Sequence, residues 1–573
     1  MENKKLVLIE NIFQAKEYLK NRKRLGNCIP ITFTFAPEEF LLKNKIKFKT
    51  EDDFEDDKIY RGIYPSSVKS AKKIIQKLSV WYKDVELVSL YYLNILCVIA
   101  SLKKYNRLLK RIINEERPDE IVVFENKNSS NKDYIPKITS NIFKGKIKVC
   151  EYNNAKIRKD YFFSTFGIIQ KIYSKIKLNM FKNSGRKIFF CGNKSAFENI
   201  IKSSDKKNAW FRVYKNLQKS FIVNRKYIPF YEFPIKTSLS KELENEILRL
   251  KEKINQLDIP KEFEIEKELG KSLKSKLDNF IGSVPEMASL INKMYILIKE
   301  KKINLLFLDN SVGPFERAFI EVCKISKIPS VIMQHGAIGL KEGFIPMGAD
   351  FILVWGNSSK EWFLKNGVSR DKIKVTGYPK YDSYIKKNSK EKIVLYLADA
   401  VNQEGAIPDI QLTKKRQKEV LKSVLRVLKK FPEYKLIIKT RIGWEMNNLP
   451  RTISKQENFK NIKIIESTDN LKLLNSAEIV IISHTTMGLE AILLDKPVIS
   501  FSYKDLDKSN IYTNKKIVKM VYSEKELEQA IKNSKSNDRN YPNQREKLLK
   551  QEFVSLDNKS SERVINFIDK LLN

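Results

Sequence analysis

The chain contains two histidines, and each stands in a polar segment that directly follows an apolar run. His335 follows Ser330–Met333 and precedes a glycine, within the tripeptide Gln-His-Gly. A neutral imidazole near pH 7 can act as a general base for a hydroxyl group, or can donate a hydrogen bond to a phosphate. Asp309 and Glu316, which follow another apolar run, are rival bases. A hydrogen-bonded structural histidine is the alternative, but the placement of both histidines after apolar runs favours function.

The second histidine lies in the segment Ser483–Glu490, which reads SHTTMGLE and leads into a predicted helix. Hydroxyls and free N–H groups at a helix N-terminus suit a phosphate or pyrophosphate. The predicted phosphate ligands are Ser483, His484, Thr485 and Thr486. Glu490 lies one turn from Thr486 on the same helix face, where its carboxylate can hold a ribose diol. A capping box, in which Thr486 or a neighbour of Met487 caps the helix and Glu490 is only a first-turn acid, explains the pattern about as well.

Two cations, Lys439 and Arg441, follow a further apolar run in the same half of the chain. Beside a phosphate site they would neutralise a leaving phosphate or diphosphate, although in a chain with 108 basic residues they also suit an ordinary surface. No acidic pair of the DxD type ends a strand near the site, so we expect no bound metal. The chain lacks GxxxxGK[ST], GxGxxG and HExxH, which leaves P-loop kinases, simple Rossmann dehydrogenases and zinc proteases without motif support.

Apolar runs alternate with amphipathic segments over most of the chain, a pattern typical of parallel α/β sheets. One series of predicted strands comprises Asn304–Leu308, Ser330–Met333, Phe351–Trp355 and Ile373–Val375. After a low-apolarity hinge at Ile385–Lys392, a second series comprises Ile393–Leu397, Tyr434–Lys439, Ile462–Ile465, Ala477–Ile482 and Pro497–Phe501. Because ligands bind beyond the carboxyl ends of such strands, the polar loops predict one cleft.

The predicted fold is α/β, with two Rossmann-like parallel-sheet domains facing across a cleft and extra N-terminal α/β and helical elements. We expect an N-terminal acceptor-side domain over residues 1–384, with a subdivision near 150–185, and a C-terminal nucleotide-binding domain over residues 385–573. In the N-terminal part, Ser66–Tyr82 and Val85–Ile113 read as two helices, apolar at i, i+3 and i+4. The lipophilic stretch Leu87–Leu102 is short for a bilayer span and predicts a buried core helix.

The composition is that of a large, basic, globular protein. Of 573 residues, 42% are hydrophobic, and Lys and Arg exceed Asp and Glu by 108 − 68 = 40. Such an excess attracts phosphorylated substrates, anionic lipid or nucleic acid, and an organism that uses lysine as its default surface residue explains it equally well. Five separated cysteines without CxxC suit a reducing cytosol, and the N-terminus does not read as a signal peptide. No zinc-finger or RRM signature is present, so no nucleic-acid partner is expected.

Four motifs together carry a resemblance to a known class: QHG, WGNS, KVTGYPKYD and SHTTMGLEAxxxDKPVI. They resemble GT-B glycosyltransferases of surface-polysaccharide synthesis, specifically the capsule polysaccharide transferases and CDP-glycerol glycerophosphotransferases, with the UDP-N-acetylglucosamine 2-epimerase fold alongside. The resemblance covers roughly residues 304–502. It implies a nucleotide-activated donor in the C-terminal domain and an acceptor near the N-terminal one.

The resemblance also implies roles for single residues. His335 would face the reaction centre, Glu490 would hold the ribose, and Gly377 and Pro379 would shape the cleft loop. The phosphate contacts would come from Ser483, His484, Thr485 and Thr486. One departure is Lys439-Thr440-Arg441-Ile442, where relatives often have Lys-x-His-Pro; Arg441 then replaces the histidine as a phosphate ligand, or the donor differs.

The resulting hypothesis is a cytosolic transferase, associated peripherally with the inner face of an anionic membrane. It would move a sugar or an alditol phosphate from a nucleotide sugar or CDP-alditol donor to a glycan or lipid-linked acceptor, without metal or cofactor. A UDP-sugar 2-epimerase is the second hypothesis, and it would work without any acceptor. A non-catalytic anion- or nucleic-acid-binding protein is the third, and it predicts salt-dependent binding without nucleotide preference.

Overall fold

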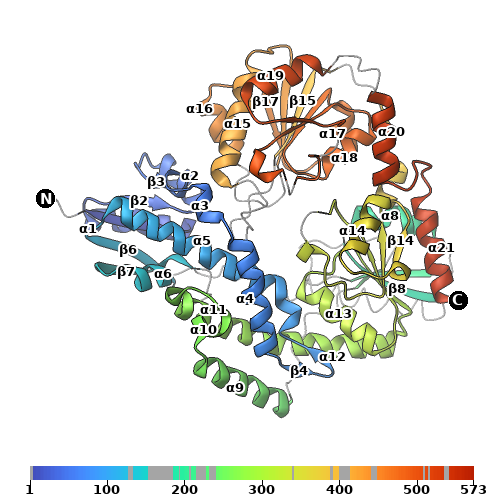
Figure 1. Ribbon diagram of the computed structural model, residues 1–573, viewed down its shortest axis with the longest axis horizontal. Coiled ribbons are helices and arrows are strands. Elements are labelled where there is room, and N and C mark those ends of the chain that lie inside the picture. The colour runs from blue at the N-terminus through green and yellow to red at the C-terminus, as the bar shows by residue number, and fades with distance from the viewer. Residues whose placement is uncertain are drawn as a thin grey trace.

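The computed structural model describes residues 4–126, 133–152, 185–192, 194–204, 208–213, 228–230, 240–338, 341–387, 391–398, 413–440, 448–507, 510–513, 516–534 and 541–573. These residues form three parallel sheets of five, seven and six strands and one two-stranded antiparallel hairpin. We call the three parts that contain the parallel sheets the first, second and third units, in chain order. Figure 1 shows the first unit in blue, the second mainly in green and yellow, and the third in orange.

The first unit has the strand order β3-β2-β1-β6-β7. Its strands are β1 (Lys5–Ile9), β2 (Ile29–Thr32), β3 (Lys49–Thr50), β6 (Glu120–Asn126) and β7 (Lys146–Tyr152). Its helices are α1 (Ile12–Leu25), α2 (Phe35–Lys43), α3 (Asp57–Tyr60), α4 (Ile63–Lys77), α5 (Tyr92–Glu116) and α6 (Ile135–Ile142). Helices α9 (Lys241–Gln256), α10 (Ile259–Phe263), α11 (Gly270–Gly282) and α12 (Val284–Lys301) then lead toward the second unit (Figure 1).

The helices predicted over Ser66–Tyr82 and Val85–Ile113 are wrong where they approach each other, because α4 ends at Lys77 and α5 begins at Tyr92. Residues 81–86 instead form the hairpin of β4 (Trp81–Tyr82) and β5 (Val85–Glu86). Its turn residues Lys83 and Asp84 have φ values of 48° and 63°, which a helix cannot continue. The predicted core helix is α5, which begins at Tyr92 and buries its apolar face.

The second unit has the strand order β10-β9-β8-β11-β12-β13-β14. Its strands are β8 (Arg186–Cys191), β9 (Asn208–Val213), β10 (Ile228–Phe230), β11 (Leu305–Leu308), β12 (Ser330–Met333), β13 (Phe351–Val354) and β14 (Ile373–Val375). Helices α8 (Lys194–Ser203), α13 (Pro314–Ile325) and α14 (Asn357–Lys365) accompany it, and the short 3₁₀ helix η6 (Pro379–Ser383) follows β14. Strands β11 and β12 are buried along their whole length, which explains their continuous apolar runs.

The third unit has the strand order β17-β16-β15-β18-β19-β20. Its strands are β15 (Ile393–Leu397), β16 (Lys435–Lys439), β17 (Ile462–Ile465), β18 (Ile479–Ile482), β19 (Val498–Phe501) and β20 (Lys519–Val521). Its helices are α15 (Lys414–Leu428), α16 (Leu449–Gln456), α17 (Asn470–Ser476), α18 (Met487–Leu493) and α19 (Glu524–Asn533). With two parallel sheets in tandem and a further N-terminal α/β unit, the predicted fold class is confirmed.

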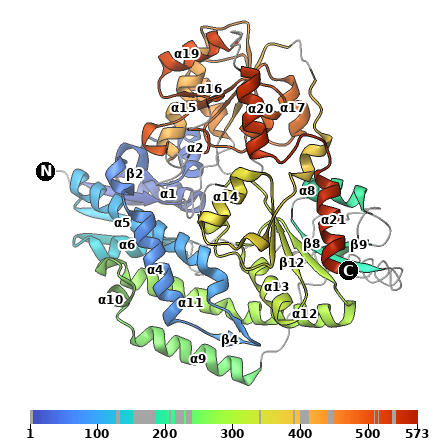
Figure 2. The same ribbon diagram turned by 45° about the vertical axis from the view of Figure 1, so that its right-hand side comes forward.

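The chain end requires a correction to the predicted domain range 385–573. After α20 (Tyr541–Glu552), helix α21 (Ser560–Leu572) returns to the second unit, where it contacts α8 and η6 (Figures 1 and 2). Its apolar face is buried there, and Phe567 packs edge-on against Phe351 of β13. Arg186 of β8 also donates a hydrogen bond to Asp569 at 2.9 Å. The C-terminal helix therefore belongs with the second sheet.

Candidate functional site

Each of the second and third sheets has a position where the order of its strands reverses. In the second sheet it lies between β8 and β11, and in the third between β15 and β18. Ligands of doubly wound sheets bind beyond the carboxyl ends of the strands at such positions. Gly192 and Asp309 follow β8 and β11, while Ala398 and Ser483 follow β15 and β18. Two predicted site residues, Asp309 and Ser483, therefore stand where the topology itself nominates a ligand.

Asp309 is buried, with 8% of its surface exposed. Its backbone N–H donates to the carbonyl of Cys191 at 3.3 Å, and its carboxylate lies against Gly192. A Cβ atom on that glycine would come within 2.3 Å of Asp309 Cγ, so the two strand ends can meet this closely only with glycine there. Glu316, the other rival base, is buried in the first turn of α13 with 3% of its surface exposed.

His335 is exposed, and the loop that carries it is clamped by the residue before it. Gln334 is 1% exposed; its Nε2 donates to the carbonyl of Gly336 at 2.9 Å, and its Oε1 accepts from the N–H of Trp355 at 3.0 Å. The imidazole stacks on Phe344, with ring centroids 5.4 Å apart and an interplanar angle of 25°. The loop thus presents an exposed imidazole on a hydrogen-bonded backbone.

The loop Ser483–Thr486 is shaped by residues that sequence reasoning missed. The carbonyl of Ser483 accepts from Ser500 Oγ at 2.9 Å and from Asn510 Nδ2 at 3.3 Å. The hydroxyl of Tyr512 donates to the carbonyl of Thr485 at 2.6 Å and accepts from the N–H of Leu489 at 3.1 Å. Asn510 and Tyr512 lie one strand further along the chain, and no local pattern links them to this loop.

Two buried hydroxyls at this edge have no hydrogen-bond partner within the described residues. They are Ser483 Oγ and Thr440 Oγ1, in residues that are 0% and 5% exposed. Ser483 follows β18 and Thr440 follows β16, so they lie on the two sides of β15. Buried hydroxyls are normally satisfied, so this edge retains hydrogen-bonding capacity for a ligand. Lys439 ends β16 and is half-buried, His484 is half-buried with its Nε2 3.5 Å from Ser502 Oγ, and Arg441 lies outside the described residues.

The loops that carry the two histidines touch each other. The N–H of Ala337 donates to Thr486 Oγ1 at 3.2 Å, which joins the loop after β12 to the loop after β18. This contact occupies the Thr486 side chain, which makes no cap to α18. The Thr486 form of the capping box is therefore wrong; the neighbouring Thr485 Oγ1 accepts from Met487 N at 3.4 Å instead.

Glu490 is 4% exposed and contacts the segment that follows β14. Its Oε1 accepts from Lys380 Nζ at 2.8 Å, and its Oε2 accepts from the Tyr384 hydroxyl at 2.6 Å. Burial, followed by the charge of Glu490, raises the pKa values of Tyr378, Tyr381 and Tyr384. These phenols therefore stay protonated, and those of Tyr381 and Tyr384 donate hydrogen bonds to the carboxylate. The contact of Glu490 with a ribose stays a prediction.

Gly377 and Pro379 shape this same segment. Gly377 has φ +82°, and an added Cβ would lie 2.4 Å from Ser560 Oγ of α21. The carbonyl of Pro379 accepts from Asn199 Nδ2 of α8 at 2.7 Å. Their neighbours in the structure are thus α21 and α8.

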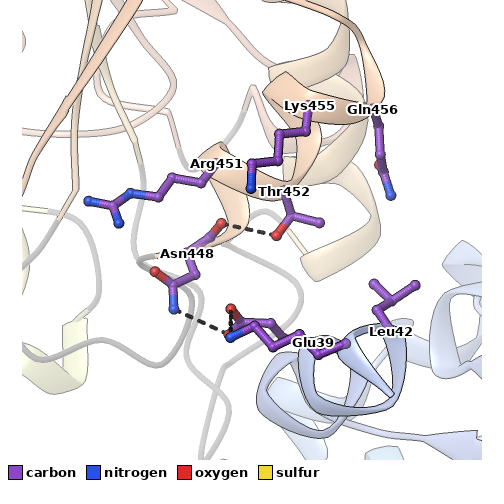
Figure 3. A pocket seen from close by; sticks show the side chains of 8 residues that line it. Glu39, Leu42, Asn448, Arg451, Thr452, Lys455 and Gln456 are labelled. Carbon is purple, nitrogen blue, oxygen red and sulfur yellow. Dashed lines mark hydrogen bonds and ion pairs between the residues drawn. The ribbon is translucent and has the colours of Figure 1, made fainter. Parts of the chain in front are cut away.

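A pocket of about 600 Å³ lies away from these loops, between α2 of the first unit and α16 of the third (Figure 3). Its wall contains none of the predicted site residues; it consists of Glu39, Leu42, Lys43, Asn448, Arg451, Thr452, Lys455 and Gln456. Asn448 Nδ2 donates to Glu39 across it at 3.2 Å (Figure 3). The pocket marks the contact between the first and third units.

Two absences among the described residues concern metal binding and membrane spanning. No group of three or more His, Cys, Asp or Glu side chains among them is placed to hold a metal ion. Within the same ranges, no helix combines the length and apolarity that crossing a membrane requires.

No protein-family model and no curated protein sequence matches the chain. Among solved structures, it is similar to the UDP-GlcNAc 2-epimerase of Neisseria meningitidis bound to UDP-GlcNAc, with 15% identity and a TM-score of 0.39 over 67% of this chain and 100% of that one. It is also similar to a UDP-N-acetylglucosamine 2-epimerase homologue from Listeria monocytogenes, with 10% identity and a TM-score of 0.43 over 68% of this chain and 96% of that one. The similarity to the wall teichoic acid polymerase TagF has 12% identity and a TM-score of 0.40 over 72% of this chain and 98% of that one.

Proposed function

We propose that the chain transfers a sugar or an alditol phosphate from a nucleotide-activated donor to a hydroxyl of a glycan or lipid-linked acceptor. The supporting observation is the contact between the His335 loop and the Ser483–Thr486 loop, at the carboxyl ends of two parallel sheets. One loop offers an exposed imidazole, and the other offers hydroxyls and a second imidazole. A two-substrate reaction needs this pairing of a base with a site for an anionic leaving group.

In the proposed reaction, the acceptor oxygen attacks the sugar carbon that carries the diphosphate, or the phosphorus of the alditol phosphate. The bond to the nucleotide breaks and its electron pair leaves with the nucleotide. His335 takes the acceptor proton, with Asp309 and Glu316 as rivals. The Ser483–Thr486 loop and Lys439 would stabilise the charge of the leaving phosphate, with Arg441 as a further ligand. The proposed reaction uses no metal or cofactor. Because a net charge of +40 attracts anionic lipid, we also propose that the acceptor is used near an anionic membrane surface.

The test is a thermal-shift panel of CMP, CDP, UMP, UDP, GDP and ADP at low and high salt. A ligand that binds only the folded state raises its stability by RT ln(1 + [L]/Kd). We expect stabilisation by one nucleotide, lost in His484→Ala and retained in His335→Gln, which should lose transfer instead. Stabilisation by UDP together with acceptor-free turnover of a UDP-sugar would indicate the 2-epimerase. Equal, salt-sensitive shifts with all six would mean a general anion site and would refute the transferase.

A further inference from the structure

The segment between the second and third units, residues 376–387, is held from three directions. From the second unit, Asn199 donates to the carbonyl of Pro379. From the C-terminal helix, the N–H groups of Ser560 and Ser561 donate to the carboxylate of Asp382 at 3.0 and 2.7 Å. From the third unit, the carboxylate of Glu490 accepts hydrogen bonds from Lys380 and Tyr384. Three parts of the chain therefore meet on η6.

The contact with the third unit is an ion pair between a buried carboxylate and a partly buried ammonium group. The side chains of Lys380 and Glu490 are 19% and 6% exposed, and their charged atoms lie 2.8 Å apart. The ammonium also lies 5.8 and 5.6 Å from the ring centroids of Tyr381 and Tyr384. Two buried charges form a defined arrangement only when each has its partner, because an unpaired charge in such a site is strongly unfavourable.

The ion pair is connected to both histidine loops. Glu490 lies one helical turn after Thr486 in α18, which begins directly behind the Ser483–Thr486 loop. Thr486 in turn accepts from the N–H of Ala337 in the His335 loop. Holding Glu490 in place therefore fixes α18, the Ser483–Thr486 loop and the His335 loop relative to one another.

We propose that Lys380 is a positioning residue of the candidate site: through Glu490 it aligns the Ser483–Thr486 loop with the His335 loop. On this account, the main role of Glu490 is the contact with Lys380 and Tyr384, and contact with a ribose is secondary. The nucleotide-binding test of this proposal rests on the proposed function, whereas the hydrogen-exchange test does not.

The first test is hydrogen exchange on the full chain without ligand. In Lys380→Met, we expect exchange on the order of tenfold faster in peptides covering 335–338 and 483–493, because local opening loses the ion pair. Peptides of β1 and β6 should not change. Lys380→Arg should restore protection, and Lys380→Met combined with Glu490→Gln provides a second variant if the single one does not fold.

The chain offers a matched control in Lys386. It lies in the same segment and pairs with Asp495 of the third unit, but the pair is exposed, with side-chain exposures of 50% and 32%. Lys386→Met should leave exchange in both loops unchanged. Unchanged exchange in Lys380→Met, or an equal change in Lys386→Met, would overturn the proposal.

The second test separates positioning from ribose contact. Binding of CDP and UDP is compared with binding of their 2′-deoxy counterparts in the wild type, Lys380→Met and Glu490→Gln. Positioning predicts that each variant weakens the ribo and deoxy forms by the same factor. A loss confined to the ribo form, and to Glu490→Gln, would show direct diol contact and refute the positioning role. If the wild type binds neither nucleotide, the proposed function fails, and hydrogen exchange still decides the role of Lys380.

Discussion

Lys414 joins the first and third units through a buried ion network, and its replacement by methionine should weaken that contact. Its side chain is 3% exposed at the start of α15, where it pairs with Glu38 of α2 and lies 3.6 Å from Glu51 and 3.7 Å from Asp52. One turn later, Lys418 reaches Glu38 at 2.7 Å and Asp52 at 2.6 Å. Burial by itself lowers the pKa of Lys414, but the carboxylates of Glu51, Glu38 and Asp52 raise it above its ordinary value.

The expected loss follows from the burial of the network. Removing one partner of a buried ion pair costs about 3–5 kcal/mol, because the other charge stays buried. Lys418 remains beside Glu38 and Asp52, so we expect the lower end, about 3 kcal/mol. Lys414→Met combined with Glu38→Gln should destabilise by less than the sum of the single changes, since the two side chains interact directly.

The assay is urea unfolding of the full chain, followed through its first transition because a chain of several units does not unfold in one step. The control is Lys430→Met, which removes an exposed lysine paired with Glu528 at 2.6 Å and should leave the transition in place. If Lys414→Met shifts the first transition no more than Lys430→Met does, the network does not hold the two units together.

Three further changes test single contacts. Burial and then the charge of Asp133 raise the pKa of Glu10 from 4.5 to about 8, so the folded protein keeps a proton that the unfolded chain releases. Stability should therefore fall between about pH 5 and 8 by up to ~1.4 kcal/mol per pH unit, and Glu10→Gln should flatten that fall in urea titrations; an unchanged slope would contradict it. Gly377→Ala, at φ +82° and against Ser560, should destabilise by about 1–3 kcal/mol in thermal unfolding, unlike Gly282→Ala, whose added Cβ meets nothing within 4 Å. Tyr512→Phe removes the hydroxyl that bridges the loop after β18, so it should cost about 1–3 kcal/mol and reduce the nucleotide-induced thermal shift; an undiminished shift would show that the loop keeps its shape without it.

Strands β11 to β19 were predictable from the sequence to within two residues, whereas β9, β10 and β20 were not predicted. The run predicted at 393–397 is β15, and those predicted at 330–333 and 373–375 are β12 and β14. Strands buried on both faces, such as β11 and β15, need apolar side chains at every position, so each appears as an unbroken apolar run. The hairpin at Trp81–Glu86 was missed because its turn is Lys83-Asp84, which lacks the Asn-Gly or Asp-Gly signal of a tight hairpin.

The residues of the candidate site also differ in whether the sequence predicted their position. The positions of His335 and Ser483 at the carboxyl ends of strands could be predicted, because His335 stands two residues after β12 and Ser483 directly after β18. Lys380 and Tyr384 could not be found, because their partner is more than a hundred residues away, and a lysine and a tyrosine in a basic chain carry no signal of burial.

The first unit explains why a resemblance confined to residues 304–502 describes only part of what orders the site. It contacts the third unit through the Lys414 network, and it contacts the second unit where Tyr64 donates to Glu342 and where Ser89 accepts from Arg317 at 3.4 Å. The second and third units are therefore connected directly through the two histidine loops, through η6 and also through the first unit. Through the Lys414 network and its contacts with the second unit, the N-terminal part of the chain constrains how the two sheets are placed, without supplying any of the predicted site residues.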